Sequence, residues 1–233
     1  TGVVQPISEI IEIIKDHNCY FHVDAAQMYG KDIDTLSNKR IDLISISGHK
    51  IFGPKGIGAL VTRLRNFNKP PLQPLFFGGG QQAKLRPGTL PVHLIVGLGT
   101  AAKIAKKNLK KRQEQNKKIY DQIIKLMKKL NGNLNGDEKY LLGNCINFSI
   151  PTVDAEAFML TTKDLISISN GSACTSSSLE PSYVLRALGL SDELAHSSIR
   201  FSVGRYTTVK DVDDAITLVR EKVEKLRDLS PLW

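Results

Sequence analysis

The chain has 233 residues, of which 41% are hydrophobic and 24% charged, and its formal net charge is +9. This composition is typical of a globular protein with one large domain or two modest ones, and it excludes a disordered chain, a fibrous repeat and a disulfide-rich miniprotein. No apolar run approaches the roughly 18 residues of a membrane span, and the first residues lack a signal-peptide pattern. Three widely spaced cysteines, Cys19, Cys145 and Cys174, indicate a reducing compartment.

The excess positive charge lies in one stretch. Residues 103–129 contain eleven Lys or Arg and two acidic residues, which accounts for the whole net charge. Apolar residues recur there at helical intervals, so the lysines are expected on the solvent face of amphipathic helices. The alternative is a polyanion site, which the scarcity of interleaved aromatic and Arg residues disfavours. We therefore expect no direct binding of nucleic acid.

In the first half of the chain, short apolar runs alternate with helical patterns. We predict a helix over 8–16, strands over 20–23, 41–46 and 57–62, and a helix over 92–106 after a Pro/Gly-rich connection. Strands separated by helical stretches indicate an α/β sheet covered by helices. Two glycines in the last helix, Gly97 and Gly99, are expected to allow close packing.

The pattern changes from residue 109 onward. We predict a lysine-rich helix, strands over 145–150, 165–169 and 199–203, and helices near 155–160, from 181 and from 209. A boundary near residue 108 then separates the end of a large α/β domain, residues 1–108, from a smaller α+β domain, residues 109–233. No internal repeat is visible.

Polar residues follow two neighbouring predicted strands. Asp24 and Gln27 come after the first strand, and Ser47, His49 and Lys50 come after the second. In an α/β sheet the carboxyl ends of such strands form one crevice, where ligands bind. Each residue also has a simpler explanation, such as a helix cap or a surface lysine. Together, a carboxylate, a hydroxyl, a phosphate-binding turn and a nucleophilic lysine indicate pyridoxal phosphate chemistry, in which the lysine binds the cofactor covalently.

Five motifs resemble the cysteine desulfurases, the NifS/IscS-like branch of the fold type I pyridoxal phosphate enzymes within the class V aminotransferases. They lie in the expected order at 47–58 (SGHKIFGPKGIG), 78–82 (GGGQQ), 86–91 (RPGTLP), 171–174 (GSAC) and 197–202 (SSIRFS). The resemblance covers nearly the whole chain. It implies that residues 1–108 form the C-terminal part of a three-layer α/β/α cofactor-binding domain, and that residues 109–233 form a small domain with the catalytic cysteine.

The resemblance also implies roles for the residues around the cofactor. Lys50 would bind pyridoxal 5'-phosphate and then move the substrate Cα proton. Asp24 would pair with the pyridine nitrogen, and Gln27 would hydrogen-bond the phenolic oxygen. Ser47 and His49 would bind the phosphate. No metal is expected, because no His or Cys pair has zinc spacing.

Two further residues would act beyond the cofactor ring. Thr89 is expected to reach the phosphate of the other subunit's cofactor, which makes a homodimer part of the active site. Arg200 is expected to bind the substrate carboxylate bidentately.

Cys174 is the expected sulfur acceptor. A small buried thiol is the simpler explanation of a lone cysteine. Its Ser/Thr-rich neighbours instead indicate a polar loop in which the thiol moves between the cofactor and an external acceptor. In the family the thiolate attacks the sulfur of L-cysteine, which leaves L-alanine and a persulfide. Cys19 and Cys145 are interpreted as structural.

The expected function is therefore that of a cysteine desulfurase for iron–sulfur cluster assembly and tRNA thiolation, in the cytoplasm or, in a eukaryote, the mitochondrial matrix. The alternatives are a noncatalytic remnant or interaction module, or a selenocysteine lyase or aminotransferase of the same superfamily. The chain begins after the family's phosphate loop and stops before the tail that docks the iron–sulfur scaffold protein. We accordingly expect it to self-associate alone or to need a complementing fragment, and its scaffold binding to be affected.

Overall fold

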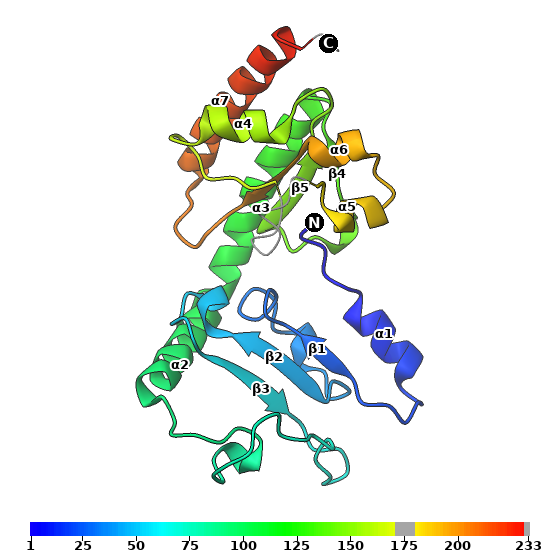
Figure 1. The fold of residues 1–233 in the computed structure, drawn as a ribbon, viewed down its shortest axis with the longest axis vertical. Coiled ribbons are helices and arrows are strands. Elements are labelled where there is room, and N and C mark those ends of the chain that lie inside the picture. Colours follow the sequence, from blue (N-terminus) through cyan, green and yellow to red (C-terminus); the bar gives the residue numbers. More distant parts are fainter. Residues whose placement is uncertain (171–179, 231–233) are drawn as a thin grey trace. The chain divides into compact units, whose positions relative to one another are not determined.

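The computed structural model describes residues 1–170 and 180–230, which form two compact units. One unit consists of residues 6–110, and the other of residues 1–5 together with 111–233 (Figure 1). Every helix in the described part of the chain is too short or too polar to cross a lipid bilayer.

The unit of residues 6–110 is built on a three-stranded mixed sheet with strand order β1–β2–β3. β1 (His22–Asp24) runs parallel to β2 (Leu43–Ser47), and β3 (Gly58–Thr62) runs antiparallel to β2. Helix α1 (Ile7–Ile14) precedes the sheet and α2 (Val92–Lys107) follows it (Figure 1). Three 3-10 turns lie between them: η1 (Thr35–Ser37), η2 (Gly48–Ile51) and η3 (Gln82–Lys84). The expected α/β class is confirmed.

A buried carboxylate fixes the start of β2. Asp42 is 3% exposed, and its oxygens accept hydrogen bonds from the guanidinium groups of Arg40 and Arg65 and from the backbone amide of Phe21. Both arginines also donate to the carbonyl of Cys19. Because a buried charge is tolerated only when it is paired in this way, the cluster ties together the chain segments before β1, before β2 and after β3.

Helix α3 (Leu109–Lys129) leads into the second unit, whose sheet is antiparallel with order β4–β5–β6. Its elements are β4 (Asn133–Leu134), η4 (Glu138–Tyr140), β5 (Cys145–Ser149), α4 (Ala155–Thr162), α5 (Tyr183–Ala187), α6 (Asp192–His196), β6 (Ser198–Ser202) and α7 (Val209–Asp228).

The first five residues pair with this second unit. Val3 forms a β-bridge with Leu141, and the amide of Val4 donates to the carbonyl of Tyr140 at 2.8 Å. Gly2 has a φ of +80°, and a Cβ there would lie 2.0 Å from the carbonyl oxygen of Cys145. Only glycine fits this crossing.

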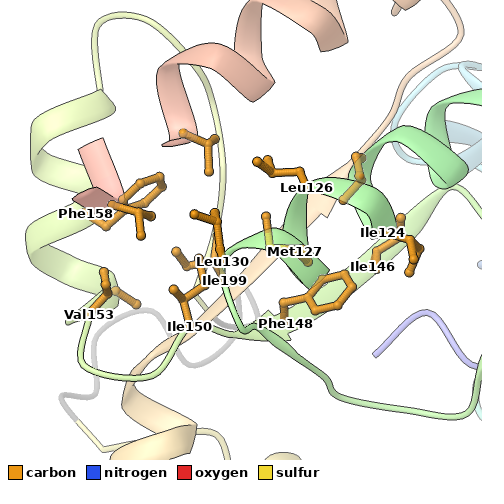
Figure 2. Close-up of a cluster of buried hydrophobic side chains, with 14 of the residues drawn as sticks. Ile124, Leu126, Met127, Leu130, Ile146, Phe148, Ile150, Val153, Phe158 and Ile199 are labelled. Atoms are coloured by element: carbon orange, nitrogen blue, oxygen red, sulfur yellow. The ribbon is translucent and has the colours of Figure 1, made fainter. Parts of the chain in front are cut away.

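One face of the antiparallel sheet forms the core of the second unit. Ile146 of β5 and Ile199 of β6 are almost fully buried, together with Met127 of α3 and Phe158 of α4 (Figure 2). The lysines of α3 lie on its exposed face, as the helical spacing predicts. The apolar stripe of α3 therefore determines which side of the helix faces the sheet.

One predicted strand of this unit is wrong, and one short helix is missing from the predictions. The strand predicted over 165–169 is wrong, because the amides of Leu165 and Ile166 donate to the carbonyl of Thr162 and so close the end of α4. Only Ser169 pairs with β6, in an isolated bridge to Arg200. The short helix α6 was not predicted; the Ser191 hydroxyl caps it by accepting a hydrogen bond from the amide of Leu194.

Two positions of α4 provide a test of this core. Phe158 is fully buried, whereas Leu160 is 68% exposed. We expect Phe158→Ala to lower the free energy of unfolding by about 3–5 kcal/mol, because it removes apolar contacts and leaves a cavity. Leu160→Ala should change it by less than about 0.5 kcal/mol. Urea denaturation followed by circular dichroism measures both, and equal losses would contradict the packing described.

Candidate functional site

The polar residues predicted to converge in the first unit do so at one edge of its sheet. β1 and β2 are parallel, and Asp24 at the end of β1 is in register with Ser45, two residues before Ser47 at the end of β2. Lys50 lies in turn η2, which starts directly after β2. Because parallel strands end at the same edge, the carboxylate, the hydroxyl and the lysine turn lie at the same end of the sheet.

Hydrogen bonds orient several of these side chains. The Ser47 Oγ and His49 Nδ1 atoms are 3.0 Å apart. Asp24 Oδ1 accepts a hydrogen bond from the amide of Ala26 at 2.9 Å, which leaves Oδ2 without a partner among the described residues. The carbonyl oxygen of Gln27 accepts from Lys31 Nζ at 2.7 Å, and its side-chain oxygen from the same atom at 3.4 Å. The amide nitrogen of Gln27 remains a donor.

Lys50 is half-buried, and its amine has no hydrogen bond or ion pair with any described residue. The turn that presents it depends on Gly48, where a Cβ would lie 2.9 Å from the carbonyl oxygen of Ile57 and 3.0 Å from that of Pro54. The Gly48 amide donates to Ile57 at 2.9 Å. The loop 53–57 therefore folds back onto the start of the turn, which holds the Lys50 amine on a fixed backbone.

The structure does not join the other predicted residues to this group. Thr89 is exposed in the connection before α2 and makes no hydrogen bond within the described part of the chain. Cys174 lies outside the described residues. Arg200 belongs to β6, in the second unit.

Arg200 lies at a small pocket of the second unit. The pocket has a volume of about 120 Å³, and its lining includes Arg200, Asn147, Asn170, Ser182, Leu185 and Thr1. The guanidinium of Arg200 has no hydrogen bond or ion pair with a described side chain. A half-buried guanidinium without a partner among the described side chains can bind a carboxylate through its N–H groups.

Two residues of the pocket lie close in sequence to the segment that contains Cys174. Asn170 directly precedes residues 171–179, and Ser182 follows them closely; both line the pocket. The amide of Arg200 donates to the carbonyl of Ser169 at 2.6 Å. Asn170 and Ser182, which flank residues 171–179 in the sequence, thus lie at the pocket of Arg200.

The predicted site residues do not include Asn147, which lines the pocket, or Asn135, whose side-chain amide donates to it. Asn147 is 5% exposed, lines the pocket and is the cross-strand partner of Arg200. A signal was present in residues 145–150, where polar residues alternate with apolar ones, so that 147 and 149 face away from the core. Asn135 had no comparable signal, since it lies in an Asn/Gly-rich turn region.

A wider hollow of about 550 Å³ lies along α3 and contains none of the predicted site residues. It is lined by Tyr120, Lys125, Lys128 and Glu138, among others. Burial, and then the negative charge of Glu138, raise the pKa of Tyr120 to about 12. The phenol therefore stays protonated at neutral pH.

Comparison with known proteins identifies the family. The family model "Aminotransferase class-V" matches residues 1–214. The chain is 50% identical to "Cysteine desulfurase IscS" of Histophilus somni (strain 129Pt), over 100% of this chain and 57% of that protein. It is 48% identical to "Cysteine desulfurase, mitochondrial" of Saccharomyces cerevisiae, over 100% and 46%. A solved structure titled "NIFS-LIKE PROTEIN" matches with a TM-score of 0.83 and 28% identity, over 96% and 58%.

The family match over residues 1–214 defines the class of protein to which this chain belongs. The chain belongs to the aminotransferase class-V family. Within that family its named relatives are cysteine desulfurases, and the chain spans about half the length of those relatives.

The packing under the lysine turn can be tested with two glycines of α2. A Cβ at Gly97 would lie 2.5 Å from Pro54 Cγ, whereas a Cβ at Gly99 would meet nothing within 4 Å. We expect Gly97→Ala to lower the free energy of unfolding by about 1–3 kcal/mol through overpacking. Gly99→Ala should be neutral or stabilising by up to about 1 kcal/mol, because alanine favours helix. Chemical denaturation distinguishes them, and matching effects would argue against close packing of α2 on the loop 53–57.

Proposed function

We propose that this chain supplies catalytic residues of a pyridoxal phosphate-dependent cysteine desulfurase, which converts L-cysteine to L-alanine and transfers the sulfur to Cys174. The unpaired amine of Lys50, on a fixed turn at the edge where Asp24 and Ser47 end their strands, is the observation on which the proposal rests. The names of the relatives support the same reaction.

The residues at the sheet edge fit the cofactor. Asp24 offers an uncommitted carboxylate oxygen for the pyridine nitrogen, and Gln27 offers an amide N–H for the phenolic oxygen. The paired Ser47 and His49 offer hydrogen-bond donors for the phosphate. Lys50 supplies the amine that binds the cofactor. When bound, the cofactor withdraws electrons from the substrate Cα.

The chain's own residues then position the substrate and move its protons. Lys50 Nζ in its neutral form accepts the Cα proton and returns a proton later in the reaction. The guanidinium of Arg200 binds the substrate carboxylate through two parallel hydrogen bonds. The unpaired state of both groups supports these roles, because neither has to be released from a protein partner first.

Cys174 receives the sulfur. Its thiolate attacks the substrate sulfur, the substrate C–S bond breaks and an S–S bond forms. L-cysteine and the Cys174 thiol thereby become L-alanine and a Cys174 persulfide, and no external oxidant is needed. The position of Asn170 and Ser182, which flank residues 171–179 in the sequence, at the Arg200 pocket supports this role.

The complete enzyme is proposed to act as a homodimer in which Thr89 reaches the cofactor phosphate of the other subunit. Large exposed side chains at Phe67, Leu75 and Phe77 support an interface on the first unit. An iron–sulfur scaffold protein and tRNA thiolation enzymes are the proposed sulfur acceptors. The proposed compartment is the cytoplasm, or the mitochondrial matrix in a eukaryote. The proposal rests on the named relatives, one of which is bacterial and the other mitochondrial.

The noncatalytic, selenocysteine lyase and aminotransferase alternatives are not favoured. Each of the named relatives above is a cysteine desulfurase, and an aminotransferase has no use for a thiol at position 174.

Replacing the lysine tests the cofactor assignment. In the complete enzyme we expect Lys50→Ala to lose the visible absorbance of lysine-bound cofactor and to lower turnover by at least about 10²-fold, because the covalent link and the proton acceptor are both removed. Lys55→Ala, in the same loop and exposed, should keep both. Absorbance that persists in Lys50→Ala would place the cofactor on another lysine.

Replacing the cysteine tests the sulfur step separately. We expect Cys174→Ala to keep the cofactor absorbance and to abolish sulfide release from L-cysteine, because no thiolate is left to attack the substrate sulfur. Cys19→Ala is the matched control, since Cys19 is an exposed thiol in the other unit. Sulfide production and cofactor spectra are measured for both variants. Undiminished turnover by Cys174→Ala would remove the persulfide from the mechanism.

A further inference from the structure

The β5–β6 pair has a polar face as well as an apolar one. Asn147 is opposite Arg200, and Ser149 is opposite Ser198, in the antiparallel register. Residues at i and i+2 share a face, so these four side chains lie on the face opposite Ile146 and Phe148. Directly opposed side chains have Cβ atoms about 4.5–5.5 Å apart. The Asn147 amide is therefore an immediate neighbour of the Arg200 side chain.

A buried hydrogen-bond network fixes the amide of Asn147. Asn135 is 3% exposed, and one N–H of its Nδ2 atom donates to Asn147 Oδ1 at 2.6 Å. The other N–H is shared between Ser149 Oγ at 2.9 Å and Ser198 Oγ at 3.1 Å. The hydroxyls of Ser149 and Ser198 in turn donate to the carbonyl of Leu194, at 2.7 Å and 2.9 Å.

This network determines which end of the Asn147 amide is available. Because Oδ1 accepts the hydrogen bond from Asn135, the other end of the planar amide is the NH₂ group, a donor. Nδ2 has no acceptor among the described residues, although Asn147 is 5% exposed. Asn147 lines the same pocket as Arg200. Its Nδ2 group, which lacks an acceptor among the described residues, is therefore one of the donors of that pocket.

We propose that Asn147 is a second substrate-binding residue, which donates through Nδ2 to the carboxylate that Arg200 binds, and that Asn135 is the positioning residue that holds it in this orientation. The inference rests on the proposed function, since it takes L-cysteine as the ligand. The named lining residues of the pocket include no acidic side chain, and its volume of about 120 Å³ suits a small amino acid. Arg200 occupies one lone pair on each carboxylate oxygen, and each oxygen keeps a further lone pair that can accept a hydrogen bond from Asn147.

The test compares two ligands of the complete holoenzyme by calorimetry: L-alanine, and ethylamine, which has an amine but no carboxylate. We expect Asn147→Ala to raise the dissociation constant of L-alanine by about 10- to 100-fold, the effect of a lost hydrogen bond to a charged group. The constant for ethylamine should change by less than about twofold, because that ligand has no carboxylate for the amide to bind.

Leu160→Ala is the control, because Leu160 is 68% exposed on α4, lies outside the hydrogen-bond network and does not line the pocket. It should leave both dissociation constants unchanged. Asn147→Asp provides a second variant that keeps an oxygen for Asn135 and replaces the donor by a carboxylate oxygen. We expect Asn147→Asp to weaken L-alanine binding at least as strongly as Asn147→Ala. If Asn147→Ala fails to fold, the result for Asn147→Asp tests the inference in its place.

Arg200→Gln separates the failure of this inference from that of the proposed function. A first outcome is that Arg200→Gln weakens the binding of L-alanine but not of ethylamine, while neither Asn147 variant does so. In that case the role of Asn147 is overturned and the proposed function stands. Equal weakening of L-alanine and ethylamine by Asn147→Ala also overturns it, since that is the result of a purely structural role. If Arg200→Gln leaves L-alanine binding unchanged, the pocket is not the carboxylate site and both are overturned.

Discussion

The register of β5 against β6 is the constraint on which the second unit depends. It places Ile146 and Ile199 on the face that packs against the helices, and Asn147 and Arg200 on the other face. A slip of one residue would exchange these faces, bury an arginine without a partner and expose the apolar core. Core packing therefore specifies the register, and the register in turn brings an amide and a guanidinium to the same pocket.

A comparable constraint acts in the first unit, through backbone rather than side-chain packing. Parallel pairing of β1 and β2 brings Asp24 to the same sheet edge as Ser47, and the turn from Gly48 then presents Lys50. The buried Asp42 with its two arginines holds the start of β2. The Lys50 amine has no hydrogen bond or ion pair with a described residue, so the charges that stabilise this unit are separate from the groups proposed to do its chemistry.

Elements with a strong period could be predicted from the sequence, and weak ones could not. The helices over 92–107 and 109–129, and the strand over 145–149, lie within a few residues of their predicted bounds because each has a long or regular apolar pattern. The apolar run at 165–169 resembles a strand. Its first two amides instead hydrogen-bond to Thr162 at the end of α4, and only Ser169 bridges to β6. Of the two glycines expected to allow close packing, only Gly97 meets a neighbour.

The sequence by itself determined the class of fold, the family and the chemical types of the candidate residues, because motifs such as 47–58 and 197–202 are local strings of residues. Only the tertiary structure decided that Asn147 faces the Arg200 pocket and that Asn135 orients its amide. Those contacts join residues on three separate strands and turns, and their geometry follows from sheet register and burial. No local pattern of residue types encodes which end of an amide is left to face a ligand.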